Sequence, residues 1–333
     1  MPGDQESAVS VIVAAGRGTV RPTLDSIRAQ DLPGCRFEII VVADETAAQD
    51  VADDPSVRLI RCETRNPAVK RNRGAREAAA PVLAFLDDDA TAPPDWLARG
   101  LAVLEAHPEI AGVGGPNLPP DDAGPAERLT DLVLNAPLIG AGSPTYSARE
   151  VQRPARIGEL HLVNLFIRRA VWDAVGGLNE AIGYGCEDSE FIYQAQRTGA
   201  AFRYDSDLVV RHARRPFGWP YVRQRFMLRT NNGRLMWVYP CLYLRRPSFL
   251  AVWAALAACI LLAVFLPFGL AAAAGVYVVA LLAYNVAAHP RWFPLLAGAL
   301  VVHHVTYASG LMWGVIVGAV TPWRTARLRR RSR

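Results

Sequence analysis

The chain has 333 residues and a net charge of +5, and half of its residues are hydrophobic (51%), enough for both a core and membrane segments. All 31 acidic residues lie at or before Asp207, so residues 1–207 carry a net charge of −11 and the rest carries +16, all from arginine. Because apolar content rises together with arginine content, the basic half is typical of a protein at an anionic membrane, and the composition argues against nucleic-acid binding.

Strand and helix patterns alternate along the first part of the chain. We expect strands at 9–15, 37–43, 57–62, 81–86 and 110–113, and helices at 23–30, 68–79 and 95–106. Such a βαβ series predicts an α/β domain, Rossmann-like, with a mostly parallel sheet and helices on both faces. Residues 117–160 are rich in Pro, Gly and Ala and are expected to form a mobile substrate loop. The predicted catalytic domain spans residues 1–212.

Three consecutive carboxylates, Asp87, Asp88 and Asp89, follow an apolar run that is typical of a buried strand. Ligands of open α/β sheets bind at the carboxyl ends of the strands, and clustered Asp oxygens suit Mg²⁺ or Mn²⁺. A metal-bound phosphate ligand is therefore the first hypothesis. The alternative is that the three residues cap the turn that follows them.

A second acidic pair, Glu187 and Asp188, follows a glycine-rich segment and precedes a helical pattern at 189–197. An N-cap role explains this pair equally well when it is taken alone. The pair lies about 100 residues after the aspartate cluster, and a strand-like segment that ends at His212 follows it. This three-part spacing favours a functional site over separate structural roles for the pair and the histidine.

Two long stretches carry no Lys, Arg, Asp or Glu: residues 247–290 and 292–323. Each exceeds the roughly 20 apolar residues that a membrane-spanning helix needs. We expect a helical hairpin at 249–266 and 270–288 and a further segment at 293–320 that crosses tilted, re-enters or lies in the interface. The predicted organisation is basic amphipathic interfacial helices at 213–247, a transmembrane region at 248–323 and a basic tail at 324–333. A buried soluble helical pair is the alternative.

Charge predicts the orientation of this region. Six arginines crowd the last ten residues, and positive residues stay on the cytoplasmic side. Residues 1–7 are polar and acidic, so no signal peptide is expected before the first strand. We therefore predict a multi-pass protein of the cytoplasmic membrane with its catalytic domain in the cytoplasm. The five cysteines are scattered without metal-binding spacing, which indicates reduced thiols.

The segment from Ala14 to Thr19 is similar to the phosphate loop of sugar nucleotidylyltransferases. The register differs, because that family places Arg directly after the Thr, whereas Val20 intervenes here. A sugar-phosphate nucleotidylyltransferase stays an alternative function, and a non-catalytic membrane-binding protein is a third.

Seven segments together point to one family. They are 9–13 (VSVIV), 38–44 (EIIVVAD), 70–75 (KRNRGA), 85–89 (FLDDD), 175–180 (VGGLNE), 187–188 (ED) and 209–212 (VVRH). The sequence resembles glycosyltransferase family two, whose members are inverting enzymes of the GT-A fold, over residues 8–215. It departs from the family at Ala43, where many members carry Asp, and at Glu45 and Thr46, which replace the usual Gly-Ser.

The resemblance implies a nucleotide-sugar donor: a UDP-, GDP- or dTDP-sugar. It implies a divalent cation, Mg²⁺ or Mn²⁺, on Asp89 and His212, and catalysis by Asp188 as the base with Glu187 beside it. The residues expected to bind the nucleotide sugar are Ala14, Asp44, Arg71, Asp87 and Asp88.

The second half of the chain is similar to membrane-bound transferases of the exopolysaccharide type, such as succinoglycan-assembly glucosyltransferases. Processive synthases carry Gln-x-x-Arg-Trp after the acidic pair, whereas here Gln224 is followed by Arg-Phe-Met-Leu. We therefore expect an inverting, metal-dependent hexosyltransferase that adds one sugar to a lipid-linked acceptor in polysaccharide or glycolipid assembly. A polyprenyl-phosphate glycosyltransferase is a further alternative.

Overall fold

The structure is a computed structural model that describes residues 7–16, 18–136, 144–147, 151–244, 274–280, 289–293 and 295–320, and isolated residues between 250 and 287. Within these ranges the chain forms two compact units. Residues 7–123 and 144–213 form the first, which we call the α/β unit. Residues 124–136 and 214–320 contribute the second, which we call the helical unit.

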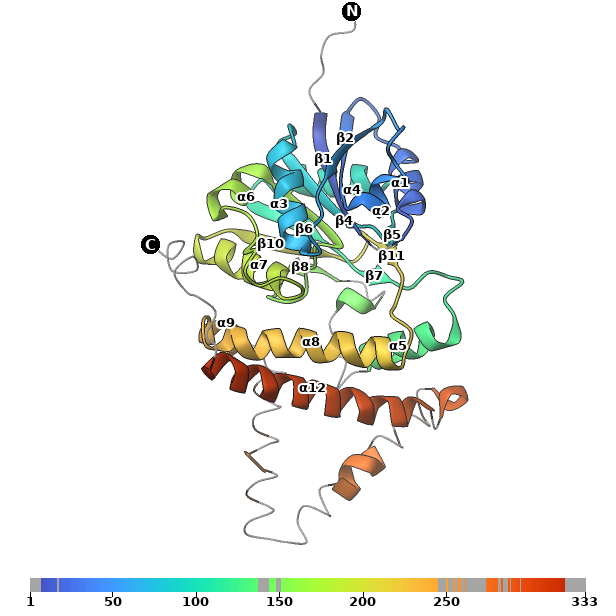
Figure 1. Cartoon of the computed structure of the whole chain (residues 1–333), viewed down its shortest axis with the longest axis vertical. Helices are drawn as coiled ribbons and strands as arrows, with labels where there is room; N and C mark the ends of the chain where they lie inside the picture. Colours follow the sequence, from blue (N-terminus) through green and yellow to red (C-terminus); the bar gives the residue numbers. More distant parts are fainter. Residues whose placement is uncertain are drawn as a thin grey trace, which may run out of the picture. The chain divides into compact units, whose positions relative to one another are not determined.

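The larger sheet of the α/β unit has eight strands in the order β3-β2-β1-β4-β9-β6-β10-β8 (Figure 1). In that order the strands are β3 (Val57–Arg61), β2 (Arg36–Ala43), β1 (Ser7–Ala15), β4 (Val82–Asp87), β9 (Asn164–Arg168), β6 (Ile110–Gly114), β10 (Ala201–Asp205) and β8 (Gln152–Pro154). The pairs of β1 with β2 and β4, of β2 with β3 and of β6 with β10 are parallel. This part of the sheet agrees with the prediction from the sequence.

Two strands make the sheet mixed. β9 runs antiparallel to both β4 and β6, and β8 runs antiparallel to β10. Parallel neighbours need a crossover of a dozen or more residues, usually a helix, and β9 is entered from the irregular segment 155–163 without one. The expectation of a mostly parallel sheet is therefore too strong.

Helices cover both faces of this sheet, as the alternation of β1 predicts. Val9, Val11 and Val13 share a core with α1 (Arg21–Arg28), α2 (Glu45–Ala48) and α4 (Trp96–Ala106). Ile12 faces the other core, built with α3 (Pro67–Glu77), α6 (Arg169–Val175) and α7 (Glu187–Arg197). In that second core Trp172 packs between Phe85 and Phe191, with ring centroids 4.8 and 4.9 Å away. Each core packs one set of helices against the sheet and therefore fixes where the first residue of each helix lies.

A three-stranded sheet brings the distant end of the α/β unit back to the aspartate cluster. Its strands are β5 (Ala90–Thr91), β11 (Val210–His212) and β7 (Asn117–Leu118), with β11 in the centre. β11 pairs antiparallel with β5, so that His212 lies opposite Ala90 and next to Asp89. A pairing of a few residues therefore places a side chain from position 212 beside carboxylates from 87–89.

The segment 117–160 is more structured than the sequence predicts. Besides β7 and β8 it forms η1 (Pro144–Tyr146) and the helix α5 (Pro125–Asn135). α5 has Pro at its first position, and Glu127 accepts a hydrogen bond from the backbone N–H of Gly124, both typical of a helix start. The prediction of one mobile loop is wrong at these residues; residues 137–143 and 148–150 lie outside the described ranges.

The helical unit is built around two long helices that run side by side, α8 (Trp219–Met236) and α12 (Leu295–Val320) (Figure 1). α5, α9 (Pro240–Leu244) and the short η2 (Pro290–Trp292) belong to the same unit. α5 is tied to the segment before α8, because Arg214 donates to Asp131 at 2.9 Å and Thr130 donates to the backbone of Arg215 at 2.8 Å.

Glycines allow α8 and α12 to approach closely. A Cβ added to Gly314 would lie 2.1 Å from the backbone oxygen of Thr230, and one added to Gly233 would lie 2.4 Å from that of Leu311. Gly310 and Gly318 make similar contacts one turn away on either side. Small residues spaced four apart are a common way to pack two helices, because backbones can meet where side chains are absent.

α8 differs from the predicted amphipathic helix. Trp219 and Met227 are exposed together with Arg223, whereas Asn232 is buried, so polar and apolar side chains are not separated onto two sides. Among the described residues, α12 is the one helix long and apolar enough to cross a membrane, with a mean hydropathy of 1.4 in its most apolar window. The hairpin predicted at 249–266 and 270–288 falls largely outside the described residues, as does the tail at 324–333.

Candidate active site

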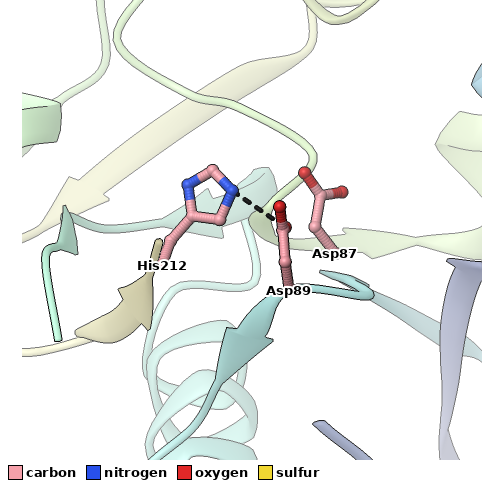
Figure 2. Close-up of side chains that lie close together, drawn as sticks. All are labelled: Asp87, Asp89 and His212. Atoms are coloured by element: carbon pink, nitrogen blue, oxygen red, sulfur yellow. Dashed lines mark ion pairs between the residues drawn. The ribbon is translucent and has the colours of Figure 1, made fainter. Parts of the chain in front are cut away.

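Three potential metal ligands meet at the carboxyl end of β4. Asp87 is the last residue of β4, Asp89 precedes β5, and His212 ends β11. Figure 2 shows the three side chains turned toward one another, with His212 Nε2 3.0 Å from Asp89 Oδ1. One ligand atom from each of the three residues lies within 4.8 Å of the others.

This geometry fits a divalent cation. Two carboxylates and an imidazole supply the oxygen and nitrogen ligands that Mn²⁺ accepts, and carboxylates suit Mg²⁺. The side chains are neither buried nor fully exposed, with 26%, 34% and 24% of Asp87, Asp89 and His212 accessible, so a cation held there can still contact a ligand from solvent. The sequence assigned Asp89 and His212 to the metal and Asp87 to the nucleotide; the structure groups Asp87 with the first two.

Asp88 points elsewhere, toward the end of β1. Its Oδ2 accepts the backbone N–H of Gly16 at 2.7 Å, and its backbone oxygen accepts the Thr23 hydroxyl at 2.9 Å. The neighbouring Ala14 is paired in β1 opposite Asp87 of β4. Ala14 and Asp88 therefore lie at the same strand ends as the cation cluster, but the Asp88 carboxylate is bonded to the protein backbone.

Asp44 lies on the same edge of the sheet and caps α2, where its Oδ1 accepts the Ala47 N–H at 3.1 Å. Lys70 is buried beside it, with Nζ 3.7 Å from Asp44 Oδ2 and hydrogen-bonded to the backbone oxygen of Ala15. A Cβ on Gly16 would lie 3.0 Å from both charged groups. The resemblance assigned Asp44 to the nucleotide base, whereas no role was predicted for Lys70.

Arg71 joins the cation cluster to the second acidic pair. Its guanidinium donates to Asp87 Oδ1 at 2.6 Å and to Glu187 Oε1 at 3.0 Å, and its side chain is only 9% exposed. Burial by itself would lower the pKa of Arg71, but the charges of Asp87 and Glu187 outweigh burial and raise it. The Arg71 guanidinium is therefore positively charged. The sequence predicted that Arg71 contacts the nucleotide sugar, whereas in the structure its guanidinium is hydrogen-bonded to two carboxylates.

The backbone before α7 is held in an unusual conformation. Cys186, the residue before Glu187, has φ of 77°, in the left-handed region that side chains other than glycine seldom adopt. Upstream, Asn72 of α3 accepts the N–H of Leu178 at 2.8 Å and donates to its oxygen at 2.9 Å, which anchors the glycine turn at 176–177. Strained backbone of this kind clusters at functional sites, and here it sets the direction of the Glu187 and Asp188 side chains.

Glu187 is the buried member of the acidic pair. Its Oε1 accepts Arg71, while its Oε2 is buried and makes no hydrogen bond to the described residues. Burial and the neighbouring Asp188 raise the pKa of Glu187 to about 7, although Arg71 opposes this shift. A carboxyl that is half protonated near neutral pH suits a structural or proton-sharing role more than that of a fixed anion.

Asp188 is the more accessible member, with 15% of its side chain exposed against 7% for Glu187. Its Oδ2 lies 2.6 Å from His161 Nδ1, and its Oδ1 accepts the Ser189 N–H at 2.6 Å. Burial raises the pKa of Asp188, but His161, the Ser189 N–H and Arg71 together lower it below its usual value. Asp188 is therefore ionised and held by two hydrogen bonds.

The sequence pointed to most of the residues that the structure brings together, but it missed His161 and Lys70. His161 stands alone between two short apolar stretches, so no motif marks it. Lys70 belongs to a group of basic residues in α3, and it is buried whereas Arg73 and Arg76 of the same helix are exposed. Both were identifiable only from their spatial partners.

Known proteins resemble this chain in sequence. The model of the family "Glycosyl transferase family 2" matches residues 10–169. The glycosyltransferase AglE of Haloferax volcanii is 27% identical over 244 residues, which are 70% of this chain and 75% of that protein. The glucosyl-dolichyl phosphate glucuronosyltransferase of the same organism is 32% identical over 102 residues, 29% of this chain and 33% of that protein.

Solved structures resemble it in fold. The mannosyltransferase PcManGT from Pyrobaculum calidifontis, solved with GDP-Man and Mn²⁺, superimposes with a TM-score of 0.56 at 20% identity, covering 96% of this chain and 90% of that one. GalNAc-T7, solved with UDP, GalNAc and Mn²⁺, gives a TM-score of 0.50 at 16% identity and covers 70% of this chain and 48% of that one. These likenesses show a GT-A-like fold.

The comparisons and the fold agree on the class of enzyme: the chain is a glycosyltransferase. The comparisons support a glycosyltransferase of family 2, because the model of that family matches residues 10–169, a range that includes Asp44, the aspartate cluster and the first residue of α6. This result favours the transferase over the nucleotidylyltransferase and the non-catalytic membrane protein that the sequence left open.

The raised pKa of Glu187 makes a stability prediction. The folded protein holds a proton on Glu187 up to about pH 7, whereas the unfolded chain releases it near the ordinary pKa of a glutamate, 4.5. The stabilisation from this proton is full below about pH 4.5 and is lost as the pH rises toward and through 7, by up to about 3 kcal/mol. Glu187→Gln lacks this titration, so its stability relative to wild type should rise between pH 5 and pH 7.5.

Thermal unfolding midpoints of the wild type and of Glu187→Gln at the two pH values measure this difference. The exposed Glu45, which pairs with Arg61, provides the control Glu45→Gln. A Glu187→Gln midpoint that follows the wild type at both pH values would show that the carboxyl ionises normally.

Proposed function

We propose that this glycosyltransferase is a divalent-metal-dependent, inverting enzyme of the cytoplasmic membrane that moves one hexose from a nucleotide-sugar donor to a lipid-linked acceptor. The observation that carries the proposal is the accessible, ionised Asp188 next to a cluster of cation ligands, with the Arg71 guanidinium reaching from Asp87 to Glu187. A proton acceptor and a site for a leaving diphosphate are thereby held a short distance apart on one rigid framework.

The chemistry follows from these positions. The acceptor hydroxyl gives its proton to the Asp188 carboxylate while its oxygen attacks the anomeric carbon from the face opposite the nucleotide. The bond between that carbon and the diphosphate oxygen breaks, and its electron pair leaves with the nucleoside diphosphate, so that the configuration inverts. A divalent cation on Asp87, Asp89 and His212 would neutralise charge on the leaving diphosphate.

The proposed binding of the donor rests on further residues at the same edge of the sheet. Ala14, Asp44 and Asp88 lie at the ends of β1, β2 and β4, where ligands of α/β sheets bind. The two solved structures described above contain GDP-Man and UDP, respectively, together with Mn²⁺. These observations support a UDP-, GDP- or dTDP-sugar and leave the base and the sugar open to direct screening.

The helical unit supports a membrane acceptor. Trp219 of α8 is 75% exposed and Val305 of α12 is 63% exposed. Further exposed apolar side chains of α12 are Leu295, Val301, Val302, Met312, Trp313, Ile316 and Val320. An apolar helix packed on an arginine-bearing one suits an anionic leaflet. The name of one relative, a glucosyl-dolichyl phosphate glucuronosyltransferase, further supports a lipid-linked acceptor.

A screen of nucleotide sugars tests the proposal as a whole. The full-length protein is incubated with UDP-, GDP- and dTDP-sugars, Mn²⁺ or Mg²⁺, and a native lipid extract. We expect one donor to release nucleoside diphosphate and to add a single sugar to a lipid, as judged by its mass. A ladder of products would contradict single transfer, and absence of release with every donor would contradict the proposal.

Asp89→Asn tests the cation site. Replacing one carboxylate by an amide weakens cation binding, so turnover with the selected donor should fall by about 10² or more, as should turnover of wild type treated with a chelator. Asp88→Asn is the matched control, because the Asp88 carboxylate faces Gly16 and not the cluster. Mn²⁺ binding, followed by electron paramagnetic resonance, should survive in Asp88→Asn and be lost in Asp89→Asn; equal Mn²⁺ affinity in both variants would refute the assignment.

Asp188→Asn and Glu187→Gln separate the base from its neighbour. The amide at 188 keeps the shape and removes the proton acceptor, so donor binding should persist while turnover falls by about 10² or more. Glu187→Gln should lose less, since the Glu187 carboxyl is already half protonated near pH 7. If Glu187→Gln is the inactive variant and Asp188→Asn turns over normally, the two roles are reversed.

Val305→Asp tests membrane contact of α12. A carboxylate in the apolar part of a bilayer costs roughly 2.5–3.5 kcal/mol, so the variant should be released from membranes by alkaline carbonate more readily than wild type. Ala102→Asp adds the same charge to an exposed helix position of the α/β unit and should stay in the pellet. Identical retention of all three proteins would mean that this part of α12 does not contact lipid.

A further inference from the structure

Among the described residues, His161 is the one residue outside α7 whose side chain forms a hydrogen bond with Asp188. Its Nδ1 lies 2.6 Å from Asp188 Oδ2, while the second carboxylate oxygen accepts the Ser189 N–H. Both side chains remain partly accessible, His161 at 27% and Asp188 at 15%. The pair is therefore close to solvent, where an acceptor hydroxyl can reach the carboxylate.

The segment that carries His161 is held firmly. Arg153 of β8 donates to both oxygens of Glu159, at 2.9 and 2.6 Å, and the N–H of Arg156 donates to one of them at 2.7 Å. The Thr145 hydroxyl donates to the backbone oxygen of Glu159 at 2.5 Å. A partly buried ion pair, together with hydrogen bonds to the backbone of Arg156 and Glu159, fixes the turn two residues before the imidazole.

Two more contacts hold His161, one at its backbone and one at its ring. The oxygen of His161 accepts the N–H of Asn164, the first residue of β9, at 3.0 Å. The ring of Tyr146, in η1, stacks over it with centroids 6.2 Å apart and an interplanar angle of 25°. These contacts leave the ring few alternative orientations, so the direction of its Nδ1 is a property of the fold.

The effect that protonation of His161 has on Asp188 depends on the charged groups that surround the imidazole. Asp188 contacts it from α7, Glu187 precedes Asp188 on that helix and is paired with Arg71 of α3, Tyr146 stacks on its ring from η1, and Glu159 belongs to its own segment. A neutral imidazole with its proton on Nδ1 donates to the carboxylate and orients it. A protonated imidazole adds a full positive charge 2.6 Å from the base and makes it a weaker proton acceptor.

We propose that His161 is a positioning residue for Asp188: its Nδ1–H aims the carboxylate at the acceptor hydroxyl, and its protonation switches transfer off on the acidic side. This inference rests on the proposed role of Asp188 in glycosyl transfer. It adds a residue that touches neither donor nor acceptor and that acts through the base alone.

Two variants of nearly equal size test it. His161→Asn retains an N–H donor at about the position of Nδ1 but cannot titrate, whereas His161→Leu has neither property. Both are assayed as full-length protein with the nucleotide sugar that the donor screen selects, with Mn²⁺ and native lipid extract, between pH 5 and pH 9. Thermal unfolding midpoints within about 2 °C of wild type establish that the variants fold; a shift of this size corresponds to roughly 1 kcal/mol at most.

We expect His161→Leu to lower kcat by about 10-fold to 100-fold with the donor KM nearly unchanged, because misdirection of the base affects the transfer step and not donor binding. His161→Asn should keep kcat within about threefold of wild type at pH 7.5. Its acidic limb should extend to lower pH than that of the wild type, because the asparagine side chain that replaces the imidazole is not protonated there.

Equal losses in both variants with an unchanged pH profile would overturn the positioning role, as would wild-type behaviour of His161→Leu. Asp188→Asn, measured in parallel, separates this outcome from a failure of the proposed function. If Asp188→Asn is inactive while both His161 variants match wild type, only the inference about His161 fails. If Asp188→Asn retains full turnover, the assignment of the base fails and the role of His161 fails with it.

Discussion

The guanidinium of Arg71 is bonded at once to Asp87, at the end of β4, and to Glu187, at the start of α7. It is buried together with Glu187, which makes the removal of either partner costly because a charge would remain uncompensated. The bond fixes the distance between the cation ligands and the acidic pair. Since these two groups handle the leaving diphosphate and the acceptor proton in our proposal, the geometry of transfer depends on this one side chain.

Two adjacent carboxylates acquire different properties from their surroundings. Burial raises the pKa of Glu187 to about 7, whereas His161 and backbone contacts lower that of Asp188. Titratable groups whose pKa values are pushed apart commonly mark distinct roles in one site. Here the separation follows from which residue faces Arg71 in the interior and which faces the segment of His161.

The helical unit shows a different constraint, that of close backbone contact. α8 carries arginines without an acidic partner on its own helix, and α12 carries no charge at all. Glycines at 310, 314 and 318 let the two helices meet backbone to backbone, so dispersion contacts replace the apolar stripe that α8 lacks. The exposed apolar side chains of α12 are then left to face outward, where we propose that lipid covers them.

The sequence by itself determined the alternation of strands and helices, the acidic cluster at the end of β4 and the family, because these features are written in local patterns of one or two elements. It could not supply the antiparallel entry of β9 or the helix α5, which depend on partners elsewhere in the sheet and on a capping arrangement hidden among Pro and Gly residues. Nor could it show that Asp87 joins Asp89 and His212, that Arg71 is bonded inward, or that His161 meets Asp188. Most of those relations join residues 16 to 125 positions apart, and only the packing of the sheet on its helices brings such residues close together.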